Sequence, residues 1–149
     1  MLPDQIMQLA IEEAQKAAQR EEVPIGAVIV RNGEILSIHG NRTRELNDPT
    51  AHAEILCIRE ACQKIGAQRI PECELYVTLE PCAMCAAAIA FARIKTLYIG
   101  ALDEKGGGIY HGPKFFNQPT CHHKKISIQH SLLADESQFI LKSFFAKKR

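Results

Sequence analysis

Two short motifs, roughly thirty residues apart, must be brought together by any fold that this chain adopts. The first is His52-x-Glu54 and the second is Pro81-Cys82-x-x-Cys85. Together they supply one imidazole and two thiols, which are ligand types that Zn²⁺ prefers, and one carboxylate that is free to carry protons. Three protein ligands leave the fourth tetrahedral position open, which distinguishes catalytic from structural zinc sites. The sequence therefore predicts one zinc ion per chain, held by His52, Cys82 and Cys85, with Glu54 beside it.

The local sequence predicts that each motif lies at the start of a helix. Residues 50–65 have a mixed apolar face, and Thr50 is a candidate N-cap, which would put His52 in the first turn. Pro81 suits the first position of a second helix, where its missing N–H costs little. The positive partial charge of a helix N-terminus favours the thiolate form of Cys82. Two helix starts that face each other would bring all three ligands onto one ion.

Other interpretations of the same residues remain open from the sequence. A C-x-x-C pair could be a redox pair of the thioredoxin type, although no H-x-E helix precedes such pairs. It could also be half of a structural zinc site, but the sequence holds no second C-x-x-C and no H-x-x-x-H. His52 and Glu54 could form an ordinary polar pair on a helix. Small buried or half-buried positions are expected for the other cysteines, Cys57, Cys62, Cys73 and Cys121.

The rest of the chain alternates between helical and extended patterns. Further helices are expected over residues 4–22, 83–92 and 133–147. Strands are expected over residues 25–30, 34–39, 74–79 and 96–101, with a short fifth strand over 126–129. This order predicts an α/β fold, a three-layer α/β/α sandwich around a central mixed sheet of about five strands. Because no linker or internal repeat interrupts it, residues 1–149 are expected to form one domain.

The net charge of +1 conceals an asymmetry along the chain. Residues 1–104 hold 10 Lys and Arg against 15 Asp and Glu, whereas residues 105–149 hold 8 against 2. A basic C-terminal third suits a polyanionic substrate, because lysines and arginines release counterions from phosphates. A solvated helix face with a basic tail accounts for the charges equally well.

Hydropathy and cysteine content set expectations for the compartment. No stretch of about 18 apolar residues exists, so no membrane span is expected. The N-terminus lacks the charged-then-apolar layout of a signal peptide. Six cysteines, two of them assigned to a metal, then favour a reducing cytoplasm.

The residues around both motifs resemble the bacterial tRNA-specific adenosine deaminase family. The resemblance is most specific over residues 48–55, D-P-T-A-H-A-E-I, and 75–85, L-Y-V-T-L-E-P-C-A-M-C, and it runs from Glu22 to the closing Phe144-Phe145. The paired motifs are the established signature of zinc-dependent nucleobase deaminases. The resemblance implies a cytidine-deaminase-like sandwich, a homodimer, and hydrolytic conversion of the wobble adenosine of an arginine tRNA anticodon to inosine.

The resemblance also assigns roles to individual residues. Zinc-activated hydroxide would attack C6 of adenine while Glu54 shuttles protons, after the base is splayed out of the anticodon stem-loop. Contacts with the base are implied for Asn41, Pro24 and the Ala53 amide, and a ribose 2′-OH contact for Asp103. Asn41 and Asp103 could instead be plain turn residues. RNA contacts are implied for Lys105, Lys147, Lys148 and Arg149.

Four related classes of protein are alternatives to this family, and features of the sequence count against each. Guanine deaminases and the riboflavin-pathway deaminase share both motifs, and only the basic C-terminal third and the Phe144-Phe145 ending count against them. Free-cytidine deaminases carry Cys where this chain has His52. A non-catalytic partner subunit would commonly lack Glu54.

The segment 106–118 departs from the family pattern in its glycine run and is expected to be a flexible, substrate-facing loop. The adjacent His122 and His123 are not expected to share a metal ion, because neighbouring residues on an extended segment point to opposite faces.

Overall fold

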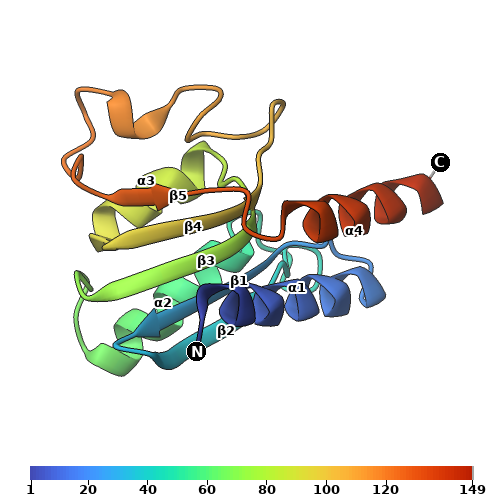
Figure 1. The fold of residues 1–149 in the computed structure, drawn as a ribbon, viewed down its shortest axis with the longest axis horizontal. Helices are drawn as coiled ribbons and strands as arrows, with labels where there is room; N and C mark the ends of the chain where they lie inside the picture. The colour runs from blue at the N-terminus through green and yellow to red at the C-terminus, as the bar shows by residue number, and fades with distance from the viewer. Residues whose placement is uncertain (149) are drawn as a thin grey trace.

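A five-stranded mixed sheet separates two pairs of helices in the computed structural model, which describes residues 1–148 (Figure 1). The helices are α1 (Pro3–Gln19), α2 (Ala53–Ile65), α3 (Ala83–Ala92) and α4 (Ala134–Lys147), with a short 3-10 helix, η1 (Phe115–Asn117). The strands are β1 (Gly26–Arg31), β2 (Glu34–Gly40), β3 (Cys73–Leu79), β4 (Thr96–Ala101) and β5 (Ser127–Gln129). The predicted order of elements is confirmed.

The sheet has the strand order β2-β1-β3-β4-β5. β1 pairs antiparallel with both β2 and β3, and β4 lies parallel to β3 and β5. Asn32 and Gly33 connect β1 to β2 with φ angles of 51° and 79°, which is the backbone that a two-residue hairpin turn requires. The parallel half of the sheet brings the carboxyl ends of β3 and β4 to the same edge.

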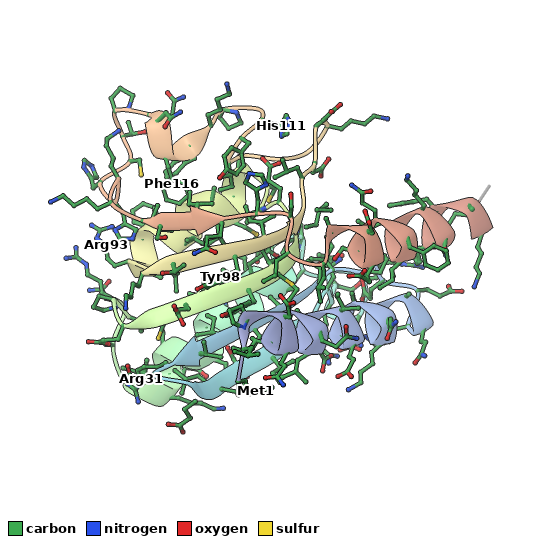
Figure 2. The ribbon with its side chains drawn as sticks, viewed as in Figure 1. Met1, Arg31, Arg93, Tyr98, His111 and Phe116 are labelled. Atoms are coloured by element: carbon green, nitrogen blue, oxygen red, sulfur yellow. The ribbon has the colours of Figure 1, made fainter. Side chains whose placement is uncertain are left out.

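The two faces of the sheet carry separate apolar cores. α1 and α4 cover one face, where Val28, Val30 and Tyr76 pack against α1. Tyr76 stacks there on Tyr98, which is labelled in Figure 2, at a ring-centroid distance of 4.3 Å. The alternate residues Ala27, Ile29, Leu75 and Val77 pack against α2 and α3 on the other face. This period-2 alternation between two helix layers confirms the predicted three-layer sandwich. Among residues 1–148, no helix is long and apolar enough to cross a membrane.

The starts of α2 and α3 each lie two residues later than the predicted caps. Thr50 is not the N-cap of α2, because the Asp48 carboxylate accepts both its N–H and its hydroxyl, at 2.9 and 2.7 Å, in a separate turn. His52 is the N-cap instead. Pro81 is not the first residue of α3, because the first helical hydrogen bond runs from Ala86 N to Cys82 O, which makes Cys82 the N-cap.

Candidate metal centre and active site

The three predicted ligands meet where the N-termini of α2 and α3 face each other. His52 Nδ1 lies 3.6 Å from Cys82 Sγ and 3.5 Å from Cys85 Sγ, and all three donor atoms lie within 4.8 Å of one another. His52 and Cys82 are the N-caps of the two helices, and Cys85 lies in the first turn of α3. The predicted convergence of the two motifs is confirmed.

The spacing of these atoms fits a tetrahedral zinc ion. Zn–S bonds of about 2.3 Å and Zn–N bonds of about 2.0–2.1 Å, at a tetrahedral angle, place nitrogen and sulfur about 3.6 Å apart. The two measured separations agree with that value. Among residues 1–148, this is the one cluster of three or more potential ligands. His122 and His123 form no second centre, since His122 is exposed and His123 Nε2 lies 2.6 Å from the Ile94 carbonyl oxygen.

The electrostatics of the cluster favour a thiolate at Cys82. Hydrogen bonds from Cys85 and then His52 lower the pKa of Cys82 to about 4, against the effect of burial. The pKa of Cys85 is raised because its thiol hydrogen-bonds to Cys82 and is buried. The pKa of His52 is raised by its hydrogen bond to Cys82. The three groups therefore share protons that a bound cation would displace.

Glu54 lies in the first turn of α2 with its carboxyl group buried beside the ligands. Its side chain is 3% exposed, and Oε1 has no hydrogen-bond partner among the described residues. Burial raises the pKa of Glu54 to about 7. A buried oxygen of this kind requires a partner, and a water in the open position of a metal would be one. A carboxyl group with a pKa near neutrality is suited to proton transfer.

The residues implied to contact the base lie in two places, Ala53 between His52 and Glu54, and Pro24 and Asn41 just before β1 and just after β2. Ala53 is fully buried between His52 and Glu54. Asn41 is 5% exposed and follows β2, and its N–H donates to the carbonyl of Ile25 at 3.1 Å, next to buried Pro24. The fold thus brings Asn41 and Pro24 together.

The loop that carries Asn41 is held by residues that the sequence did not single out. Glu22 is buried and accepts the N–H groups of Arg44 and Glu45, at 3.2 and 2.8 Å. Arg20 donates to the carbonyl oxygen of Asn41 at 3.0 Å. Residues 20–22 were predicted to extend the first helix, but α1 ends at Gln19 and Glu21 has a φ angle of 65°. The end of α1 therefore anchors the polar loop instead of continuing as a helix.

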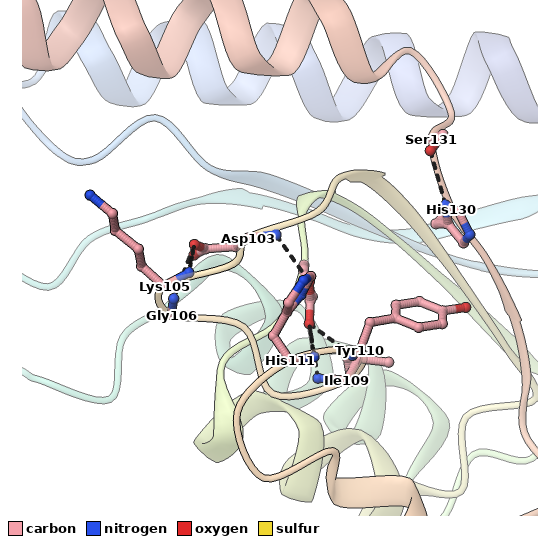
Figure 3. Close-up of polar contacts among 9 residues, drawn as sticks. Asp103, Lys105, Gly106, Ile109, Tyr110, His111, His130 and Ser131 are labelled. Carbon is pink, nitrogen blue, oxygen red and sulfur yellow. Dashed lines mark hydrogen bonds and ion pairs between the residues drawn. The ribbon is translucent and has the colours of Figure 1, made fainter.

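Asp103 forms a turn just past β4. Its Oδ1 accepts the N–H groups of Lys105 and Gly106, at 3.1 and 3.0 Å (Figure 3). Asp103 is therefore a turn residue, which was one of the two roles that the sequence allowed for it. Asp103 also lines a cavity of about 630 Å³ between the end of β4 and α4, together with Lys105, Lys142 and Phe145.

The predicted RNA-contacting lysines of the C-terminus lie on and just past α4. Lys147 is exposed, and the Lys148 Nζ lies 3.8 Å from a carboxylate oxygen of Glu21 and 5.3 Å from the centre of the Phe144 ring. Arg149 lies outside the described residues. The basic end of α4 thus contacts Glu21, which lies just past the end of α1.

The loop after β4 differs from the expected loose segment. Glu80, which directly precedes Pro81 and Cys82, is buried, and it accepts hydrogen bonds from Asp103 and from residues 109–111 (Figure 3). Burial alone would raise the pKa of Glu80, but the hydrogen bonds from Asp103, His111, Tyr110 and Ile109 lower it below the ordinary value. Local patterning could not reveal this carboxylate, because its donors lie 23 to 31 residues away.

The remaining cysteines take the predicted places. Cys57, Cys73 and Cys121 are buried, Cys62 is half-buried, and none of the six cysteines forms a disulfide. Burial raises the pKa of Cys57 above its ordinary range and that of Cys73 to about 11, so both remain neutral thiols.

Comparison with known proteins identifies relatives over nearly the whole chain. The model of the MafB19-like deaminase family matches residues 2–149. The tRNA-specific adenosine deaminase of Agrobacterium fabrum is 57% identical, over 96% of this chain and 93% of that protein. The enzyme of the same description from Aquifex aeolicus is 43% identical with the same coverage.

Comparison with solved structures leads to the same family. A structure from a study of A-to-I editing by tRNA:A34 deaminases superposes with a TM-score of 0.90 at 57% identity, over 92% of this chain and 99% of that one. A guanine deaminase from Nitrosomonas europaea superposes with a TM-score of 0.83, but at 20% identity this likeness shows the fold alone. The chain therefore belongs to the MafB19-like deaminase family, among the tRNA-specific adenosine deaminases.

Proposed function

We propose that this chain hydrolyses the wobble adenosine of a tRNA anticodon, of an arginine tRNA in particular, to inosine. The observation that carries the proposal is the convergence of His52, Cys82 and Cys85 beside the buried, unpaired carboxyl oxygen of Glu54. The 57% identity to a tRNA-specific adenosine deaminase supports adenosine in tRNA, rather than a free base such as guanine, as the substrate.

The chemistry follows from the positions of these residues. His52, Cys82 and Cys85 would hold Zn²⁺, which lowers the pKa of a bound water from 15.7 to about 7. Glu54 would take a proton from the attacking water and deliver it to N1 of adenine, and would then carry a second proton to the amine on C6. Water thereby adds to C6, ammonia leaves and inosine remains. The base must leave its stack before this chemistry can reach C6.

Substrate contacts complete the proposal. Asn41, Pro24 and the amide of Ala53 contact the flipped base, and Asp103 accepts the ribose 2′-OH. The cavity of about 630 Å³ beside Asp103 supports a neighbouring nucleotide site, because Lys105 and Lys142 line it with Phe145. Lys147, Lys148 and Arg149 contact the RNA backbone. We also propose that residues 1–149 form one domain and that the protein acts in the cytoplasm, where tRNA is found.

Ammonia release under matched conditions tests the choice of substrate. Zinc-loaded protein is incubated with an arginine anticodon hairpin that contains the wobble adenosine, and in parallel with guanine and with cytidine. We expect ammonia from the hairpin alone. Ammonia from guanine without reaction of the hairpin would retain the zinc chemistry and overturn the proposed substrate.

The Asp103→Asn substitution is expected to weaken the preference for RNA over DNA. The asparagine oxygen keeps the turn with Lys105 and Gly106, but the charged acceptor for the 2′-OH is lost. Because a hydrogen bond to a charged group contributes about 1.5–3 kcal/mol, the RNA-to-DNA ratio of kcat/KM should fall about tenfold or more. Rates on matched RNA and DNA hairpins measure this ratio, and Glu104→Gln, an exposed neighbour, is the control. An unchanged ratio would refute the role of Asp103.

We also propose a homodimer that forms through the face shared by α2 and α3. Phe91 is 72% exposed there, beside a groove of about 400 Å³ whose lining includes Ile55 and Ile58. An exposed aromatic ring with apolar neighbours marks a contact surface for another protein.

The Phe91→Glu substitution is expected to convert the dimer to a monomer, because the contact would lose its apolar ring and gain a charge that must be removed from water. Sedimentation velocity measures the mass, and Phe139→Glu, at an equally exposed phenylalanine on α4, is the control. A monomeric unaltered chain, or a dimer that survives Phe91→Glu, would contradict this interface.

A further inference from the structure

The Glu80 carboxylate is the centre of a hydrogen-bond cluster that joins two loops of the site. Its side chain is fully buried. Oε1 accepts from Asp103 N at 3.0 Å and from His111 Nδ1 at 2.8 Å. Oε2 accepts from the N–H groups of Ile109, Tyr110 and His111 at 3.1, 2.9 and 3.2 Å (Figure 3). Five donors therefore point at one carboxylate.

The chemistry of a carboxylate explains this arrangement. An ionised carboxylate is only an acceptor, with about four lone-pair sites, so His111 must be the donor in its contact with Glu80. Three successive backbone N–H groups form a concave anion site. Hydrogen bonds to a charged acceptor are roughly twice as strong as those between neutral groups. Glu80 therefore fixes the path of residues 109–111.

The glycine run packs this loop directly against the turn that carries a metal ligand. A Cβ atom at Gly107 would overlap the Glu80 carboxylate. One at Gly108 would lie 2.6 Å from Ala83 N and 2.8 Å from the carbonyl carbon of Cys82. Gly108 N also donates to the carbonyl oxygen of Pro81 at 2.8 Å. The glycines at 107 and 108 are needed for close approach, which is a different use of glycine from flexibility.

We propose that Glu80 is a positioning residue, which holds the loop 103–111 and the turn 81–83 as one rigid unit, and that His111 is its side-chain partner. In this unit the proposed substrate contact Asp103 keeps a fixed place relative to the ligand Cys82. The effect on catalysis rests on the proposed function, but the rigid unit itself does not.

Glu80→Gln is the first test, because glutamine keeps the shape but offers one acceptor oxygen and turns an NH₂ group toward backbone donors. We expect kcat/KM on the anticodon hairpin to fall about 10- to 100-fold, as when a partner outside the metal's own ligands is lost. The loss should lie mainly in KM, since the loop carries the proposed substrate contact Asp103 while Cys82 is still held by α3. Zinc content should be unchanged.

A pair of substitutions at His111 provides a milder test. His111→Ala removes the side-chain donor, whereas His111→Asn places an amide nitrogen about where the imidazole Nδ1 lies. We expect His111→Ala to raise KM and His111→Asn to restore it. His122→Ala, at an exposed histidine outside the cluster, should leave KM unchanged.

Amide hydrogen exchange gives a readout that does not depend on activity. Peptides covering residues 109–111 should be protected in the unaltered chain and should exchange faster in Glu80→Gln and His111→Ala. Faster exchange with an unchanged KM, or a loss of zinc that accounts for the lost activity, would overturn substrate positioning by Glu80. Unchanged exchange in both variants would overturn the rigid unit. An unaltered chain that fails to deaminate the hairpin but shows this exchange pattern would refute the proposed function and leave the rigid unit supported.

Discussion

Glu54→Gln is expected to abolish deamination without removing the metal. Glutamine fits the same buried space in α2 but cannot take a proton from water or deliver one to N1 of adenine. A positioned acid–base group contributes about 10²- to 10⁴-fold to rate, so kcat should fall by that factor. Single-turnover kinetics on the anticodon hairpin measure the change, and zinc analysis of the same sample tests retention of the metal.

Glu60→Gln is the matched control, because Glu60 lies on the same helix but pairs with His39 and Lys64 at the surface. It should deaminate at the unaltered rate. A Glu54→Gln protein that remains nearly as active as the unaltered chain would contradict the role of Glu54 as proton carrier.

Cys85→Ser is expected to empty the metal site and to eliminate activity as a result. Cys85 is fully buried, and its Sγ lies 3.5 Å from His52 Nδ1, so no other thiol can replace it there. The loss of a residue that only hydrogen-bonds to a metal ligand lowers metal affinity about 10- to 100-fold. Because Cys85 is itself a proposed ligand, its loss should lower the affinity for zinc by more than about 100-fold. Competition with a chromogenic chelator measures the affinity.

Cys62→Ser is the matched control for this substitution. Cys62 is half-buried on α2 and takes no part in the ligand cluster, so the variant should bind zinc as the unaltered chain does. If Cys85→Ser also retained zinc with unchanged affinity, the three-ligand site would be wrong.

The convergence of the three candidate ligands could be predicted from the sequence because each motif is local. His52 and Glu54 are two residues apart, Cys82 and Cys85 are three apart, and each pair is placed by the start of one helix. The strand 96–101 and the order of elements were also predictable from apolar periodicity. The exact caps were not, because Asp48 captures Thr50 in a turn that the helix pattern does not reveal.

The supports around the centre could not be predicted, because they join segments distant in the chain. Glu22 and Glu80 look like ordinary acidic residues in the sequence, yet each is buried against the backbone of a loop more than twenty residues away. Gly107 and Gly108 suggested flexibility, since glycine is permissive, whereas the fold uses them for close packing. Local patterns therefore revealed the candidate ligands and Glu54, but not the buried carboxylates that hold the neighbouring loops.

Mass-spectrometric mapping of inosine in a full-length arginine tRNA tests the central claim most directly. Zinc-loaded protein would be incubated with a transcript that carries adenosine at the wobble position. The mass of each nuclease fragment would then show whether an amino group has been replaced by oxygen. The account predicts inosine at the wobble position, none at the other adenosines, and none with Glu54→Gln. Inosine spread over other adenosines, or none at the wobble position with zinc bound, would contradict it.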